Sequence, residues 1–217
     1  MKLFVDTAHV REIETLAPLG IIDGVTTNPS LLAAVGGDPR TVLKRICDVV
    51  QGPVSAEVVA TDSEGMVREG RELAAIDPQI VVKVPFGKSG VQACYRLVGE
   101  GTRVNVTLIF SAAQAMLAAK VGAAFVSPFI GRLDDVATPG MDLIAQIVDI
   151  FQNYPFSTEL LAASIRGPMH IVEAARLGAD VCTCPPKVIE SLFNHPLTDI
   201  GLEKFLADWA KVHEPVA

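Results

Sequence analysis

Cysteine and histidine are scarce in this sequence, and their spacing matches no common disulfide or metal motif. Only four cysteines occur in 217 residues, and none of them form a C-x-x-C motif. This excludes a disulfide framework, so we expect reduced thiols and a cytoplasmic protein. The histidines form no H-x-x-x-H or H-E-x-x-H motif, so we expect no metal site. We interpret all four as structural or surface residues: His9, His170, His195 and His213.

A long apolar run and an excess of basic charge are also missing. The apolar run at residues 3–5 is ended by Asp6 and is too short for a signal peptide or a membrane span. The formal net charge of −7 gives no electrostatic footprint for nucleic acid or an anionic membrane. It is still compatible with a local basic pocket for phosphate. The sequence therefore predicts neither nucleic acid nor a membrane as a partner.

No linker, charge block or low-complexity segment divides the chain, so we expect a single domain over residues 1–217. Hydrophobic residues make up 50% of the chain, enough for a sizeable core. Apolar, β-rich runs alternate with helix-period segments along the whole length, which is typical of repeated βα units. Eight strands are expected, near residues 2–5, 24–26, 54–58, 80–86, 103–108, 124–126, 156–162 and 180–183.

These eight units favour an α/β fold of the (β/α)8 TIM barrel type, with an additional C-terminal helix over residues 202–212. A doubly wound open sheet is the alternative, but its G-x-G-x-x-G motif is absent after the first strand. The terminal helix carries Phe205, Leu206 and Trp209 on one face. This face either closes the barrel of its own chain or packs on a neighbouring subunit.

One lysine lies inside an apolar strand. Lys83 is flanked by three valines in the stretch 80–86, and Pro85 is expected to end the strand just beyond it. Burial disfavours an ammonium ion, so a desolvated lysine can become a neutral amine that attacks carbonyl groups. The alternative is a lysine that reaches the surface or pairs with a carboxylate.

Other polar side chains fall at or near the ends of predicted strands. In a barrel these ends surround one mouth, where polar groups are typical of catalytic sites. Asp6 and Glu57 supply carboxylates that could move protons for an amine nucleophile such as Lys83. A plain ion pair between Glu57 and Lys83 is the alternative. The remaining polar residues of this kind are Asn28, Asn105, Thr107, Ser127 and Ser164.

Guanidinium groups follow the sixth and seventh predicted strands. Arg132 lies in a predicted loop with Asp134 and Asp135, and Arg166 follows Ser164 closely. Guanidinium groups suit the oxygens of a phosphate group, so we interpret the two arginines and Ser164 as a phosphate clamp. A surface ion pair of Arg132 with one of the two aspartates is the alternative.

Motifs spread over nearly the whole chain indicate a family. They are FVDTA from Phe4, TTNPSLL from Thr26, VVKVPF around Lys83, NVTLIFS from Asn105, VSPFIGRLDD from Val126, LAASIR from Leu161 and HPLTDIGLEKFLADW from His195. With them the sequence resembles the small bacterial transaldolases and the related fructose-6-phosphate aldolases. The resemblance implies a class I aldolase barrel in which Lys83 forms a Schiff base with a ketose phosphate, without a metal or an organic cofactor. It also implies a homo-oligomer, a pentamer or decamer, in which the terminal helix reaches a neighbouring subunit.

The resemblance further implies roles for the polar residues. Asp6 acts as an acid or base at the hydroxyl groups of the donor sugar, and Glu57 with Thr107 holds a catalytic water. Asn28 and Asn105 contact the intermediate. The other implied substrate contacts are Ser127 on the donor side, Phe129, and the acceptor phosphate residues Arg132, Ser164 and Arg166.

Two positions separate the branches of this family. The aldolase branch usually has Gln where this chain has Glu57 and Tyr where it has Phe129. A tyrosine hydroxyl can transfer a proton and release free dihydroxyacetone, whereas Phe129 cannot, so the enamine waits for an aldehyde. We therefore expect a transaldolase of the pentose phosphate pathway. It converts sedoheptulose 7-phosphate and glyceraldehyde 3-phosphate into erythrose 4-phosphate and fructose 6-phosphate. An aldolase that releases free dihydroxyacetone and a non-catalytic phosphosugar-binding barrel are the alternatives.

Overall fold

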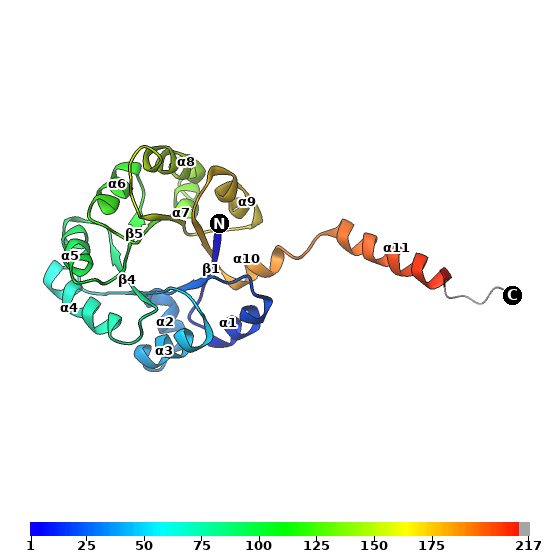
Figure 1. The fold of residues 1–217 in the computed structure, drawn as a ribbon, viewed down its shortest axis with the longest axis horizontal. Coiled ribbons are helices and arrows are strands. Elements are labelled where there is room, and N and C mark those ends of the chain that lie inside the picture. Colours follow the sequence, from blue (N-terminus) through cyan, green and yellow to red (C-terminus); the bar gives the residue numbers. More distant parts are fainter. Residues whose placement is uncertain (213–217) are drawn as a thin grey trace.

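Eight parallel strands form a closed barrel in the computed structural model of this chain, which describes residues 1–212 (Figure 1). Each strand pairs with the next and β8 pairs with β1, so the sheet has no open edge. The (β/α)8 prediction is thus confirmed, while His213 lies outside the described residues. The strands are β1 (Lys2–Asp6), β2 (Gly24–Thr26), β3 (Val54–Glu57), β4 (Ile80–Pro85), β5 (Val104–Ile109), β6 (Phe125–Pro128), β7 (Glu159–Ala162) and β8 (Val181–Cys184).

Helices follow the strands and cover the barrel from outside (Figure 1). A large cluster of aliphatic side chains fills the layer between strands and helices. None of the helices within residues 1–212 is both long and apolar enough to cross a membrane. The helices are α1 (Val10–Leu16) with the 3-10 turn η1 (Ala17–Leu19), α2 (Pro29–Val35), α3 (Pro39–Val49), α4 (Ser63–Ala74), α5 (Lys88–Gly99), α6 (Ala112–Lys120), α7 (Ile130–Asp134), α8 (Gly140–Phe151), α9 (Pro168–Leu177), α10 (Pro186–Ser191) and α11 (Pro196–Val212).

A second, smaller apolar cluster fills the inside of the barrel. It includes Phe4, Phe125 and Leu161, and the two phenylalanine rings meet edge to face with centroids 5.9 Å apart. Side chains alternate along a strand, so Val81 of this cluster and Lys83 share the inward face of β4. The inner cluster is therefore an apolar floor, and polar side chains begin above it toward the carboxyl ends of the strands.

Helix α7 is a local feature that the sequence pattern does not predict. The sequence predicts a loop around Arg132, whereas residues 130–134 form this short helix. Five residues are too few for an apolar period to appear, so pattern analysis cannot distinguish such a turn of helix from a loop. Arg132 is consequently held on a helix directly beyond β6.

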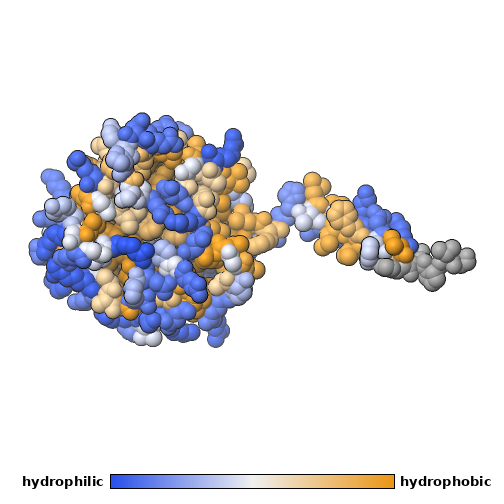
Figure 2. All heavy atoms as spheres, viewed as in Figure 1, coloured by the Kyte–Doolittle hydropathy of each residue, from blue (hydrophilic) through white to orange (hydrophobic). Residues whose placement is uncertain are grey.

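Helix α11 lies away from the barrel (Figure 1). It begins at Pro196 rather than at residue 202, and none of its described residues is buried. The alternative in which it closes the barrel of its own chain is therefore wrong. Large apolar side chains on it are exposed, including Leu197, Phe205 and Leu206, and Figure 2 shows apolar surface along this helix.

Candidate active site

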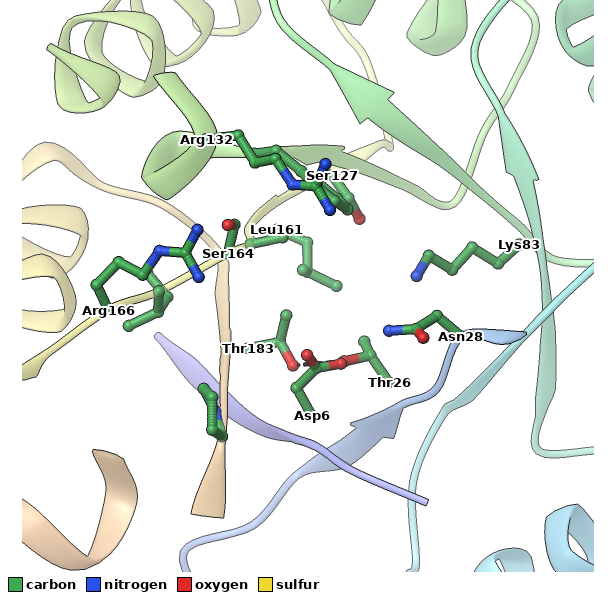
Figure 3. Close-up of a pocket in the computed structure, with 14 residues that line it drawn as sticks. Asp6, Thr26, Asn28, Lys83, Ser127, Arg132, Leu161, Ser164, Arg166 and Thr183 are labelled. Atoms are coloured by element: carbon green, nitrogen blue, oxygen red, sulfur yellow. Dashed lines mark hydrogen bonds between the residues drawn. The ribbon is translucent and has the colours of Figure 1, made fainter. Parts of the chain in front are cut away.

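A cavity of about 210 Å³ opens at the carboxyl ends of the barrel strands (Figure 3). In a parallel barrel these ends meet at one mouth, which brings together side chains that are far apart in the sequence. All of the predicted site residues except Glu57, Asn105 and Thr107 line it. The lining residues are Asp6, Thr26, Asn28, Lys83, Ser127, Phe129, Arg132, Leu161, Ala163, Ser164, Ile165, Arg166, Thr183 and Pro185.

Lys83 is buried near the carboxyl end of β4, with 5% of its surface exposed. Its Nζ donates a hydrogen bond of 3.1 Å to the carbonyl of Thr27 and lies 3.1 Å from Glu57 Oε2. The strand register causes this proximity, because Glu57 on β3 and Asn105 on β5 are the direct neighbours of Lys83. The amine points into the cavity (Figure 3). The ion pair with Glu57 is thus formed, and it sits beside the space where a substrate would bind.

Asp6 is the second carboxylate at the mouth. Its Oδ1 accepts a hydrogen bond of 2.6 Å from Thr26 Oγ1, which lies 2.6 Å from Thr183 Oγ1. Burial raises the pKa of Asp6 above its ordinary value of 3.8, and the hydrogen bond from Thr26 and the charge of Lys83 oppose this only in part. A carboxyl group with a raised pKa is suited to accept and return a proton.

Asn105 and Thr107 lie on β5 and are completely buried. The side-chain Oδ1 of Asn105 accepts a 2.7 Å hydrogen bond from Ser127 Oγ, and its Nδ2 donates a 3.2 Å hydrogen bond to Ser55 Oγ. Thr107 Oγ1 has no hydrogen-bond partner among residues 1–212. A buried hydroxyl of this kind can bond to a bound water or a substrate oxygen.

The two polar atoms of the Asn28 side chain serve different purposes: the oxygen caps a helix and the nitrogen faces the cavity. Its Oδ1 caps helix α2 by accepting a 2.9 Å hydrogen bond from the backbone N–H of Leu31. Asn28 lies on the same side of the cavity as Lys83, and its amide nitrogen points into the cavity (Figure 3). Asn28 therefore presents fixed N–H donors to whatever occupies the cavity.

Arg132 lies over an aromatic ring. Its guanidinium carbon is 5.9 Å from the centroid of Phe129, which allows a cation–π contact. The predicted alternative, an ion pair with Asp134 or Asp135, is not formed within the part of the chain that the structure describes. Instead, Arg166 Nη2 donates a 2.7 Å hydrogen bond to Asp135 Oδ2. Ser164 and Arg166 lie across the cavity from Lys83 (Figure 3).

The backbone around Ser164 is strained and tightly packed. Ser164 has φ of 62°, a left-handed conformation that is uncommon for a residue with a side chain. A Cβ atom at Gly131 in α7 would lie 2.1 Å from the carbonyl oxygen of Ser164 and 2.8 Å from Nε of Arg166. Only glycine allows this approach, so α7 and residues 164–166 form one packed unit.

Sequence reasoning missed Thr26 and Thr183, which both line the cavity. Both lie near the carboxyl ends of strands, on β2 and β8. The alternation of side chains along a strand could have indicated Thr183, because it shares the inward face of β8 with Val181 of the apolar floor. A threonine in a β-branched run does not stand out by its chemistry, since threonine is itself favoured in strands.

Metal ligands are not grouped in the described part of the chain: residues 1–212 contain no cluster of three or more His, Cys, Asp or Glu side chains that could hold an ion. The four cysteines are also no candidates for ligands or nucleophiles, because all are buried free thiols. Burial raises the pKa of Cys94 to about 12, which keeps this thiol protonated and unreactive at neutral pH. The titratable groups at the mouth are therefore the lysine, the carboxylates and the arginines described above.

We expect Asp6→Asn to raise the stability of the protein at neutral pH. Because burial raises the pKa of Asp6, the folded protein keeps this proton at pH values above 3.8 at which the unfolded chain has already lost it. Stability therefore falls as the pH rises from 3.8 to the pKa of the folded state, and the charged carboxylate destabilises the fold above that range. Asparagine removes the charge and can still accept the hydrogen bond from Thr26. Thermal unfolding should show a higher midpoint for the variant at pH 7, and this difference should shrink as the pH falls from 7 toward 3.8. An equal difference at both pH values would contradict the assignment.

Comparison with known proteins places these features in a family. The model of the transaldolase/fructose-6-phosphate aldolase family matches residues 3–216. A probable transaldolase of Rhodospirillum centenum is 60% identical over 217 residues, which cover 100% of this chain and 94% of the relative. One of Paracoccus denitrificans is 59% identical with 100% of both chains covered, and one of Aquifex aeolicus is 56% identical with 99% of both covered.

A solved structure with a similar fold is more distant. A chain of a designed cube-shaped, highly porous protein cage, made by fusing symmetric oligomeric domains, aligns with a TM-score of 0.60 at 16% identity. The alignment covers 84% of this chain and 62% of the cage chain, and at this identity it shows the fold alone. The match of the family model and the identity to full-length relatives together show that the chain belongs to the transaldolase/fructose-6-phosphate aldolase family.

Proposed function

We propose that this protein is a transaldolase that transfers a dihydroxyacetone unit between sugar phosphates through a Schiff base on Lys83. The observation that carries the proposal is the buried Lys83 amine at the cavity, 3.1 Å from Glu57. The proposed reaction converts sedoheptulose 7-phosphate and glyceraldehyde 3-phosphate into erythrose 4-phosphate and fructose 6-phosphate. Family membership and the probable transaldolases among the relatives support this assignment.

The first step joins Lys83 to the carbonyl carbon of the ketose. Glu57 takes a proton from the ammonium ion, which frees the amine to add to the carbonyl group. The added nitrogen passes one of its two protons to the former carbonyl oxygen, which becomes a hydroxyl group. Glu57 then gives its proton to this hydroxyl, so one water leaves and an iminium ion remains. The contact of 3.1 Å between the two side chains allows this proton to move directly.

The second step breaks the bond between C3 and C4 of the ketose, so that the first three carbons stay on Lys83. Asp6 accepts the proton of the hydroxyl on the carbon that becomes the aldehyde, and the bonding electrons move into the iminium group to give an enamine. The enamine then attacks a second aldehyde, whose oxygen receives the proton from Asp6. Its raised pKa favours this exchange, because the protonated form is stabilised by burial.

Water and phosphate are held by the remaining residues. We assign Glu57 and the unpaired hydroxyl of Thr107 to the water that hydrolyses the final iminium ion. Asn28, Asn105 and Ser127 contact the hydroxyl groups of the bound intermediate. Arg132, Ser164 and Arg166 bind the phosphate at the other end of the cavity, where guanidinium groups suit phosphate oxygens.

The proposed reaction also bears on the cofactors, the location and the domain organisation of the protein. The reaction uses only side chains of this chain and sugar phosphates, so we propose no metal or organic cofactor. We place the enzyme in the cytoplasm as a single barrel domain, because its four cysteines are free thiols, as is usual in a reducing compartment. Detection of the native protein in an exported fraction of its cells would contradict this location.

We also propose that the protein is a homo-oligomer, a pentamer or decamer, in which α11 packs on a neighbouring copy. The exposed apolar side chains of α11 support this, because large apolar surface on a helix usually marks an interface. We expect Phe205→Glu with Leu206→Glu to reduce the mass in sedimentation toward that of one 23.0 kDa chain. Glu203→Ala, a change at a polar position of the same helix, should leave the mass unchanged. A native protein that sediments as a single chain would overturn the proposal.

The Schiff base can be trapped chemically. Incubation with fructose 6-phosphate and borohydride should add a reduced three-carbon fragment to Lys83, which peptide mass analysis can locate. Lys83→Ala should lose activity by about a thousand-fold or more, because the covalent route is gone. Lys88→Ala, a change in the first turn of α5, serves as the control and should keep its activity. An unmodified Lys83 would leave only the alternative of a phosphosugar-binding barrel without catalysis.

Acceptor dependence separates a transaldolase from an aldolase that releases free dihydroxyacetone. We expect fructose 6-phosphate to yield little glyceraldehyde 3-phosphate unless erythrose 4-phosphate is present, because Phe129 has no hydroxyl to protonate the enamine. The double variant Glu57→Gln, Phe129→Tyr should increase acceptor-free release by about ten-fold. Fast acceptor-free release by the native enzyme would favour the aldolase. No gain in the double variant would contradict the role given to these two positions.

A further inference from the structure

Two separate segments carry the arginines at the phosphate end of the cavity. Arg132 lies on α7, while Ser164 and Arg166 lie beyond β7. His170, in the first turn of α9, contacts both segments. Its Nδ1 accepts a 3.2 Å hydrogen bond from the backbone N–H of Arg166, and its Nε2 lies 3.3 Å from Asp134 Oδ2 at the end of α7.

These contacts fit one tautomer of the neutral imidazole ring. Because Nδ1 accepts a hydrogen bond, it carries no proton in the neutral ring, and the proton lies on Nε2, which faces the carboxylate of Asp134. Asp134 is itself fixed, since its Oδ1 accepts a 2.9 Å hydrogen bond from the backbone N–H of Gly140. The ring therefore connects the backbone of one segment to an anchored side chain of the other.

A second side-chain contact, an ion pair, also joins residues 164–166 to α7, but it is more exposed to water. Arg166 and Asp135 form an ion pair, but their side chains are 53% and 58% exposed, and exposed pairs contribute little. The side chain of His170 is only 22% exposed. Ser164 has a left-handed backbone that persists only when its surroundings hold it in place. Of the two side-chain ties, the one through His170 is thus better shielded from water.

We propose that His170 is a positioning residue of the phosphate site, which holds residues 164–166 against α7 so that Arg132, Ser164 and Arg166 converge on one phosphate group. This inference rests on the proposed function, because it requires the phosphate of the substrate at this end of the cavity. His170 lies outside the residues that line the cavity, so it acts through Arg166 and Asp134.

The test compares acceptors with and without phosphate. With saturating fructose 6-phosphate, His170→Ala should raise the KM for erythrose 4-phosphate by about ten-fold and change kcat by less than about two-fold. The KM for erythrose, which has no phosphate, should stay unchanged. His170→Asn keeps an acceptor near the position of Nδ1 and should raise the KM for erythrose 4-phosphate by only about three-fold. Met169→Ala, a change at a side chain that is 63% exposed, is the control and should match the native enzyme.

A binding measurement separates this inference from the proposed function. Calorimetric titration with glycerol 3-phosphate, a phosphate ester without a carbonyl group, should give weaker binding for His170→Ala and His170→Asn than for Met169→Ala. If the His170 variants bind glycerol 3-phosphate more weakly but the native protein has no transaldolase activity, the proposed reaction is refuted, while the role of His170 at a phosphate site stands. Weaker binding in Arg132→Gln but not in the His170 variants would overturn the inference alone. Equal losses with both acceptors, or a fall in kcat alone, would also overturn it, because they indicate a merely structural role. If His170→Ala fails to fold, the Asn variant decides by the same criteria.

Discussion

The ion pair between Lys83 and Glu57 is the interaction on which the rest of the site depends. Lys83 is almost completely buried, and an ammonium ion that loses its water without gaining a partner costs several kcal/mol. The carboxylate at 3.1 Å and the carbonyl of Thr27 at the same distance offset this cost, so the amine can remain inside the barrel. The register of β3 and β4 puts the two charges side by side without ordering any loop. The geometry of this pair is therefore a property of the barrel itself.

The two ends of the cavity are built in different ways. Lys83 and Asp6 lie on strands, where the hydrogen bonds of the closed sheet fix their positions. Arg132 and Arg166 lie on segments beyond the strands, which are joined by a backbone hydrogen bond from the N–H of Ile130 to the carbonyl of Ala163 and by side-chain contacts such as those of His170. Side chains on paired strands are placed more accurately than side chains on the segments that follow the strands. The lysine and the aspartate of the cavity thus lie on the hydrogen-bonded sheet itself.

The sequence predicted the barrel because its apolar runs alternate with helical segments, and it located Lys83 and Asp6 because polar residues at strand ends are conspicuous. It did not predict α7, which is too short to show a helical period. The direction of α11 was equally beyond reach, since an amphipathic helix has the same pattern whether it packs on its own chain or on another. His170 appeared to be a structural or surface residue, because its contacts to Arg166 and Asp134 arise only when three segments fold together.

The apolar floor beneath Lys83 has a consequence for the order of events. Phe4, Phe125 and Leu161 fill the barrel below the amine of Lys83 and are at most 4% exposed, so within residues 1–212 the cavity is open at the mouth and blocked at the floor. An aldehyde released from the donor must leave by the path that the acceptor uses to enter. Both aldehydes must also occupy the same place, so the outgoing and incoming sugars exclude each other. Because the barrel is closed at its floor, the first aldehyde must leave before the acceptor can bind.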